Sequence, residues 1–230
     1  MRIEPVAGPH QPADDQSADD RPADHRPGVD DRPAADAPAA DARGAGPAPT
    51  VHLVPMRRRH LRSVLRIEGQ VYPRPWSFTL FLTELSLRST RHYVVARVDS
   101  GVVGYAGLMV SLDEGHVTNI AVDPAWQRHQ IGTRLLLNLH RAALARGARH
   151  MTLEVRVSNT AAQNMYRRFG YETEGLRKNY YAETKEDALI MWAHDVDSPA
   201  HAARLAAIEA GIRGDTIDGT GAGAHPGAGA

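Results

Sequence analysis

Apolar residues recur with two different periods across residues 51–195. Around 61–67 they recur every three or four positions, which is typical of an amphipathic helix, and around 92–98 they form a β-branched run typical of a strand. The pattern predicts strand, helix, helix, three strands, helix, strand, helix and two strands. These elements are expected at 51–56, 58–69, 78–87, 92–98, 101–112, 115–123, 131–147, 150–157, 158–170, 171–181 and 187–194.

Turn and capping residues mark the borders of these elements. The runs 99–101 and 113–115 each end in glycine and are typical of hairpin turns, so we expect three successive antiparallel strands. Ser77 is a candidate N-cap, while Gly147 and Gly170 are placed to end helices. The order of elements predicts an α/β fold with a mixed sheet and helices on both faces.

The clearest helix is predicted at 131–147, because its apolar residues form a single stripe at helical spacing. The stripe consists of Ile131, Leu135, Leu136, Leu139 and Ala143.

Composition restricts the folded domain to about 51–195. Residues 1–50 are rich in Asp, Ala and Pro and hold no aromatic residue, so they cannot bury enough apolar surface to offset the entropy of ordering. We expect residues 1–50 to be a disordered acidic tail. Residues 196–230 are expected to form a short Ala-rich helix followed by a disordered Gly/Ala-rich tail. The interpretation is a single domain with two tails.

Charge differs between these segments. Residues 1–50 hold five Arg and ten acidic residues (net −5), 51–195 carry a net charge of +7, and 196–230 a net charge of −2. A basic body favours an anionic ligand or an RNA-rich partner, but acidic tails that only keep a basic domain soluble explain the pattern equally well.

Several classes of site are excluded or disfavoured. The chain has no cysteine, so it has no disulfide, thiolate metal site or cysteine nucleophile. Its twelve His lie at no spacing typical of metal ligands, and we expect no metal. There is no signal-peptide pattern and no apolar run near the roughly 18 residues that span a bilayer. A soluble, cytoplasmic protein without a membrane partner is expected.

The stretch DPAWQRHQIGTRLL (123–136) joins a predicted strand to the long helix. An anion bound there would accept hydrogen bonds from the amides of about 129–133, assisted by the helix dipole and by Arg128 and Arg134. The segment lacks GxxxxGK[ST] and GxGxxG, so a triphosphate P-loop is excluded and a dinucleotide turn is disfavoured. A strand–turn–helix without any ligand remains the alternative.

Three polar residues follow in the next strand and helix. Strand alternation directs Glu154 away from Leu153 and Val155, and a carboxylate among apolar strand residues is unusual. Asn159 and Tyr166 are two helical turns apart, so both can face one cleft. The alternatives are a solvated glutamate on an edge strand and a buried core tyrosine.

Together these segments resemble the GNAT N-acetyltransferase family, and within it the RimI type that acetylates the N-terminal alanine of a ribosomal protein. The resemblance covers about 51–195 and excludes both tails. It is carried by VYPRPWSF (71–78), TNIAVDPAWQRHQIGTRLL (118–136), LEVRVSNTAAQNMYRRFGYE (153–172) and LRKNYYAETKEDALIMW (176–192).

The resemblance implies a role for each matching residue. Acetyl-coenzyme A would be the co-substrate, Glu154 the general base, Tyr166 the general acid and Asn159 a coenzyme contact. The cradle of the pyrophosphate would comprise Arg128, His129, Gln130, Ile131, Gly132 and Thr133. The strand that pairs with the pantetheine arm and supplies an amide to the thioester carbonyl would be Ile120, Ala121 and Val122. The walls of a peptide groove would be Trp76, Tyr180 and Tyr181.

The sequence departs from the family at Gln130, where glycine is usual. Glutamine is tolerated if its φ is negative, since the hydrogen bonds come from the backbone. Burial of Glu154 among apolar neighbours is expected to raise its basicity.

The expected reaction is direct transfer of acetyl to the N-terminal amine of a protein, a ribosomal protein being favoured, with no direct nucleic-acid binding. A small-molecule amine acceptor and a non-catalytic acetyl-coenzyme A-binding module are the alternatives.

Overall fold

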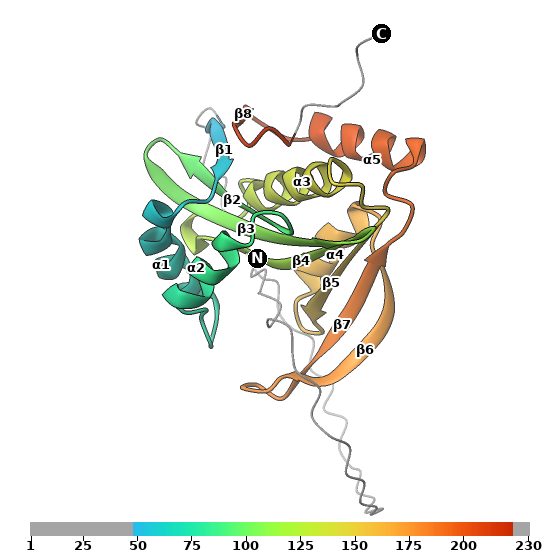
Figure 1. The fold of residues 1–230 in the computed structure, drawn as a ribbon, viewed down its shortest axis with the longest axis horizontal. Helices are drawn as coiled ribbons and strands as arrows, with labels where there is room; N and C mark the ends of the chain where they lie inside the picture. Colours follow the sequence, from blue (N-terminus) through green and yellow to red (C-terminus); the bar gives the residue numbers. More distant parts are fainter. Residues whose placement is uncertain (1–47, 223–230) are drawn as a thin grey trace, which may run out of the picture. The chain divides into compact units, whose positions relative to one another are not determined.

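The computed structural model describes residues 48–222, which contain one eight-stranded sheet of order β6-β7-β5-β4-β3-β2-β1-β8 (Figure 1). The acidic tail predicted for 1–50 lies almost wholly outside the described residues, as do the last eight residues of the C-terminal tail. The predicted order of elements and the mixed sheet are confirmed.

The element bounds agree closely with the hydrophobic pattern. The strands are β1 (Val51–Pro55), β2 (Arg91–Val98), β3 (Gly101–Ser111), β4 (Glu114–Val122), β5 (His150–Arg156), β6 (Glu172–Tyr181), β7 (Glu186–Ala193) and β8 (Thr216–Asp218). The helices are α1 (Leu61–Val71), α2 (Phe78–Ser86), α3 (Ile131–Leu144), α4 (Thr160–Arg168) and α5 (Pro199–Ala210), with short 3-10 turns at Arg58–His60 and Pro124–Trp126. Helix α1 continues to Val71 rather than ending near Gly69, and Pro73 follows soon after.

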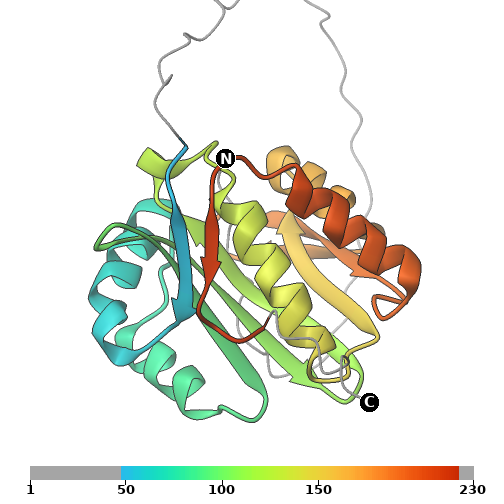
Figure 2. The same ribbon diagram turned by 90° about the horizontal axis from the view of Figure 1, so that it is seen from above.

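Helices cover both faces of the sheet, as predicted. One apolar core lies between the sheet and α1 and α2 and contains Leu61, Ile67 and Phe81. A larger core lies on the opposite face beneath α3, α4 and α5. All five residues of the predicted α3 stripe are buried in it. In Figure 2, α1 and α2 lie at one side of the sheet, and α5 lies alongside α3 at the other.

Strands β4 and β5 separate along their length, and this separation creates the site. They pair in parallel only where Glu114–His116 on β4 lie beside His150–Thr152 on β5. Beyond this point a register shift opposite Gly107 leaves Thr118 as an extra residue, a β-bulge that bends β4. A side chain at 107 would come within 2.5 Å of Asn119 Oδ1, so only glycine fits beside the bulge.

The segment after residue 195 packs onto the domain. Helix α5 contributes Leu205 and Ile208 to the core under α3, and β8 extends the sheet by pairing with β1 in parallel. The predicted Ala-rich helix corresponds to α5, but the expectation that a disordered tail follows it directly is wrong for residues 211–222, which contain β8. Strand β8 has three residues, and its partner β1 lies more than 150 positions earlier in the chain.

Candidate active site

The turn between β4 and α3 encloses a small cavity at the helix N-terminus. The cavity has a volume of about 150 Å³ and is lined by Val122, Trp126, Gln127, Arg128, Gln130, Ile131, Gly132 and Thr133. Six of the residues predicted to hold the coenzyme therefore line this cavity. His129 is exposed instead, with its Nδ1 2.9 Å from the Gln127 carbonyl oxygen and its ring against Trp126.

Gln130 adopts a left-handed backbone conformation with φ 57° and ψ 21°, so the condition under which glutamine was expected to be tolerated, a negative φ, is not met. This conformation costs a non-glycine residue roughly 1–2 kcal/mol. Its side chain offsets the cost through two hydrogen bonds: Nε2 donates to the Gly211 carbonyl (3.0 Å), and Oε1 accepts from the Arg213 amide (2.8 Å). A left-handed residue followed by helical Ile131 points successive amides to one side, which favours an anion.

Arg134 does not face this cavity, contrary to the expectation that it assists phosphate binding. It is only 1% exposed, and its guanidinium donates to the carbonyl oxygens of Arg213 (2.5 Å) and Asp215 (3.1 Å) and to the hydroxyl of Thr216. All of these acceptors belong to the C-terminal segment. Arg128 therefore remains the cation at the turn, together with the helix dipole.

The end of β4 beyond the separation carries Ile120, Ala121 and Val122, but Ala121 pairs with Tyr105 on β3, so its backbone does not face the gap, contrary to expectation. The Asp123 amide donates to Val103 on β3, so by alternation the backbone groups of Val122 and Ile120 point away from β3 towards the gap. The Ile120 carbonyl accepts a hydrogen bond from the Tyr72 hydroxyl at 3.0 Å. Ile120 and Val122 thus offer backbone donors to a ligand between the strands.

Glu154 lies on β5 just past the point where the strands separate, and it is only 6% exposed. Its Oε2 is 2.8 Å from Nε2 of His116 on β4, and its Oε1 is 3.2 Å from a guanidinium nitrogen of Arg177 on β6. Three strands therefore contribute to one charged cluster at the separation.

The pKa of Glu154 is lowered, whereas the sequence reasoning expected a raised basicity. Burial acts in the expected direction and raises the pKa, but the hydrogen bond and charge of His116 and the charge of Arg177 together outweigh it. The side chain is therefore ionised at neutral pH and can accept a proton without first losing one.

Tyr166 on α4 is 2% exposed, and burial raises the pKa of its phenol well above the ordinary value. Its hydroxyl makes no hydrogen bond with any residue between 48 and 222. Tyr166 lies close enough to Tyr72 and Tyr181 to contribute to the raised pKa of each phenol. A protonated phenol with an uncommitted hydroxyl can donate a proton to a ligand.

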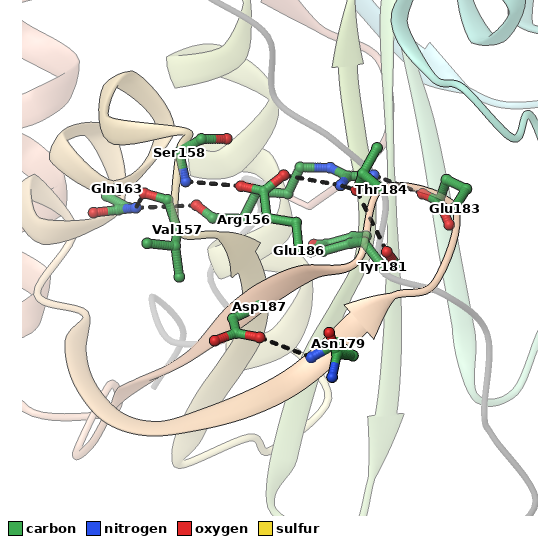
Figure 3. A network of polar contacts seen from close by, with 10 residues as sticks. All are labelled: Arg156, Val157, Ser158, Gln163, Asn179, Tyr181, Glu183, Thr184, Glu186 and Asp187. Carbon is green, nitrogen blue, oxygen red and sulfur yellow. Dashed lines mark hydrogen bonds and ion pairs between the residues drawn. The ribbon is translucent and has the colours of Figure 1, made fainter. Parts of the chain in front are cut away.

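Tyr180 and Tyr181 lie at the end of β6, and Arg156 fixes the loop that follows them. Its guanidinium lies 3.7 Å over the Tyr181 ring, and it donates to Glu183 (2.7 Å) and Glu186 (3.0 Å) (Figure 3). Tyr180 is half-buried, and burial and the nearby Glu154 charge raise its pKa to about 12. These contacts hold the hairpin beside Glu154.

A bulge in β6 contains Asn179 and Tyr180 and ends at Tyr181. The register between β6 and β7 shifts between Arg177 and Tyr181, and Asn179 within the bulge has φ 51°. The Asn179 amide donates to the Asp187 carboxylate at 2.8 Å (Figure 3). Bulges redirect side chains, and this one sets the directions of Tyr180 and Arg177.

A second cavity, of about 470 Å³, lies between the α1–α2 loop, the start of α4 and the β6–β7 loop. It is lined by Pro73, Arg156, Ser158, Asn159, Thr160, Ala161, Thr184 and Glu186. Asn159 caps α4 by accepting from the Ala162 amide, while its Nδ2 is buried without a partner among the described residues. That unpaired donor fits the predicted contact with a coenzyme.

Trp76 lies in the core rather than on a groove. It is 9% exposed, packs 5.3 Å from Phe81 between ring centroids, and its amide donates to Oε2 of Glu68 at 2.7 Å. Glu68 is fully buried, and burial raises its pKa to about 8. Pro73, from the same loop, lines the second cavity instead.

Sequence reasoning missed the residues that surround Glu154. His116 and Arg177 come from β4 and β6, and no local pattern brings them together with β5. Glu68 carries a signal that could have been used, since a charged residue stands within the apolar stripe of α1. Tyr72 ends the same helix, and its hydroxyl reaches the open edge of β4.

The arrangement combines an anion cradle, an open strand edge, an ionised carboxylate and a protonated phenol. These are the parts needed to hold a phosphate-bearing thioester, accept a proton from an amine and donate one to a thiolate. Within residues 48–222, no group of three or more His, Asp or Glu side chains could hold a metal ion. No helix in this range is long and apolar enough to cross a membrane.

The fold and site define an acyl-coenzyme A-dependent N-acyltransferase. The sequence model of the acetyltransferase (GNAT) family matches residues 61–171, and the chain belongs to this family. It is an N-acetyltransferase whose acetyl donor is acetyl-coenzyme A.

Relatives with named activities are 31–38% identical to this chain over the aligned residues. A Bacillus subtilis protein, provisionally named a ribosomal protein bS18-alanine N-acetyltransferase, is 38% identical over 60% of this chain and 91% of its own. The Salmonella typhimurium enzyme of that name is 37% identical over 57% and 88%. The crystal structure of the Escherichia coli ribosomal-protein-S18-alanine N-acetyltransferase matches with a TM-score of 0.58 and 31% identity, covering 63% of this chain and 94% of that one.

Proposed function

We propose that this enzyme acetylates the N-terminal α-amino group of a protein, and that its acceptor is a ribosomal protein with N-terminal alanine. The names of the relatives support the acceptor class. The observation that carries the proposal is Glu154, a buried and ionised carboxylate at the separation of β4 and β5.

Glu154 is the proton acceptor. An α-amino group has a pKa of about 8, so it is mostly protonated at neutral pH and must lose a proton before or during attack. Glu154 takes this proton directly or through a water molecule. His116, hydrogen-bonded to Glu154 and 22% exposed at its side chain, connects the carboxylate with solvent and provides the route by which the proton leaves.

Acetyl-coenzyme A supplies the acetyl group as a thioester. Negative charge that develops on the acetyl oxygen is stabilised by a backbone N–H of Ile120 or Val122, the two residues whose amides point into the gap. Tyr166 donates a proton to the departing sulfur. The absence of cysteine agrees with direct attack by the amine.

The coenzyme is held by the cradle at the start of α3 and by Asn159. The amides of Ile131, Gly132 and Thr133 bind the pyrophosphate with the help of the helix dipole and Arg128. The buried Nδ2 of Asn159 donates to the pantetheine arm.

A peptide fits the acceptor side better than a small amine. Tyr180 and Tyr181 form the irregular end of β6, and Tyr180 lies close enough to Glu154 for the carboxylate charge to raise its pKa, so the pair can flank an extended backbone at the acceptor side. A small amine would use only the region next to Glu154.

A panel of peptides with different first residues tests the proposal, with release of coenzyme A as the measurement. We expect peptides that begin with Ala or Ser to be preferred. The panel includes free amines and a peptide with a blocked N-terminus and an internal Lys. E154Q protein provides the background rate. Turnover of free amines alone, or of the blocked peptide at the same rate, would refute the assignment.

A further inference from the structure

Three polar residues on one stripe of α3 bind the C-terminal segment 211–220. Gln130, Arg134 and Asn138 are spaced four residues apart and therefore lie one above another on the helix. We propose that this segment is part of the acetyl-coenzyme A site, because its contact with Gln130 holds the pyrophosphate cradle in its binding conformation. The proposal rests on the assignment of the 150 Å³ cavity to the coenzyme.

The contacts are continuous along the stripe. Gln130 binds both the carbonyl of Gly211 and the amide of Arg213. One turn further along α3, the buried Arg134 guanidinium donates to the carbonyl oxygens of Arg213 and Asp215. Asn138 Nδ2 then donates to Asp218 (2.8 Å) and Thr220 (2.7 Å).

The segment is anchored independently of the cradle. Strand β8 pairs with β1, and the Gly219 amide donates to the Leu53 carbonyl at 2.8 Å. Helix α5 packs against α3 immediately before Gly211. A segment fixed at both ends can hold the Gln130 side chain in one place.

Gln130 connects this anchor to the coenzyme site. It is the N-cap of α3, it lines the cavity, and its left-handed φ sets the direction of the amides that follow. Most L-residues avoid this conformation, and the side-chain hydrogen bonds to 211 and 213 compensate for it. The segment lies outside residues 61–171, which the family model matches.

Substitutions at Gln130 separate the side-chain contact from the backbone strain. Q130A keeps the strain and loses both hydrogen bonds, and we expect it to weaken coenzyme A binding about tenfold, measured by calorimetry. Q130G loses the same hydrogen bonds but removes the strain, so its affinity should stay within about threefold of wild type. Equal affinities for Q130A and wild type would overturn the proposal.

Substitutions at Arg213 test whether the segment itself matters. R213P removes the N–H that Gln130 accepts, whereas R213A keeps it. We expect R213P to bind coenzyme A at least fivefold more weakly than R213A in the wild-type background, and equally in the Q130G background. Two outcomes would contradict a contact made through Gln130. The first is that R213A weakens coenzyme A binding as much as R213P does, and the second is that R213P still weakens it relative to R213A in the Q130G background.

Two controls identify what is being perturbed. E209A breaks the Arg141–Glu209 ion pair (2.6 Å) between α3 and α5, and should leave coenzyme affinity unchanged. S-acetyl-pantetheine, which lacks the pyrophosphate, should be used by Q130A and wild type with the same kcat/KM. A raised KM for acetyl-coenzyme A with unchanged kcat is expected for Q130A.

Thermal unfolding of each variant shows whether it is folded, and if R213P does not fold, the pair Q130A and Q130G decides. Failure of wild type to bind coenzyme A would instead remove the cavity assignment itself.

Discussion

At Glu154, ion pairing and basicity act against each other. His116 and Arg177 keep the carboxylate ionised in a buried position, where an unpaired charge would be costly. The same contacts lower its pKa, so proton transfer from an ammonium group to Glu154 is uphill. Attack that accompanies proton loss, with His116 beside the carboxylate, reduces this cost because the proton need not remain on Glu154.

Removal of the carboxylate tests its role directly. We expect E154Q to lower kcat by roughly 10²-fold or more, the range for loss of a general base, with coenzyme A affinity unchanged. Because the pKa of Glu154 is below its ordinary value, the wild-type pH–rate profile should show no inflection from Glu154 between pH 5 and 7. Its rise should follow deprotonation of the substrate amine.

A control variant for E154Q is E174Q, which alters a half-exposed glutamate on β6 that pairs with His194. Its kcat should equal that of wild type. If E154Q retained the kcat of wild type, Glu154 would not be the base.

Single residues were predictable only where they belong to a motif. Glu154 and Tyr166 were identified because their segments resemble a known family. His116 could not be, since its partner lies 38 positions away on another strand. Gln130 was recognised as a departure, but its compensating contacts lie more than 80 positions further along the chain.

Among the elements, the β6–β7 hairpin depends on one buried cation. Arg156 is 5% exposed and joins β5 to Glu183, Thr184 and Glu186, while Glu186 also accepts from the Ser158 amide at 2.9 Å (Figure 3). Loss of one partner leaves the other charges partly buried and unpaired, which is strongly destabilising. The hairpin tip is therefore the element most sensitive to Arg156.

We expect R156M to raise KM for a peptide acceptor about tenfold or more, because the loop after Tyr181 loses its anchor and the ring loses its cation. The affinity for coenzyme A should change less than threefold, since Arg156 does not line the α3 cradle and Asn159 is held by its own hydrogen bond from the Ala162 amide. Steady-state kinetics with a fixed peptide and calorimetry with coenzyme A measure the two quantities.

R168M, at an exposed position at the end of α4, provides the matched control. A loss of coenzyme affinity as large as the loss for peptide would assign Arg156 to the coenzyme side.

The regular elements were predictable because each has a strong local pattern. The three antiparallel strands follow from their turn residues, and Gly147 and Gly170 take the left-handed φ expected after a helix. Strand β8 has no such pattern, because its three residues pair with β1 through tertiary contacts alone. The separation of β4 and β5 was likewise not readable from residue periodicity.

For the whole molecule, buried titratable groups on opposite faces set the pH range of stability. Burial lowers the pKa of His140 under α5 and of its neighbour His201, whose Nε2 is 3.1 Å from Nδ1 of His140. A lowered histidine pKa means that the unfolded chain binds more protons below about pH 6.5, so stability is lost as the pH falls below that value.

Glu68 acts in the opposite direction on the α1 face. Burial raises its pKa from 4.5 to about 8, so between these values the folded state keeps a proton that the unfolded state has lost. Stability is then greatest below pH 4.5 as far as Glu68 is concerned, and decreases as the pH rises to about 8. The loss amounts to at most roughly 5 kcal/mol.

Urea unfolding at several pH values should therefore give a maximum of stability near pH 6, with E68Q flattening only the alkaline side. The amide of E68Q is uncharged and still accepts from the Trp76 amide, so the variant should be more stable than wild type at pH 8. E172Q, at an exposed position on β6, should show the wild-type profile. An alkaline limb that persists in E68Q would mean that Glu68 does not control it.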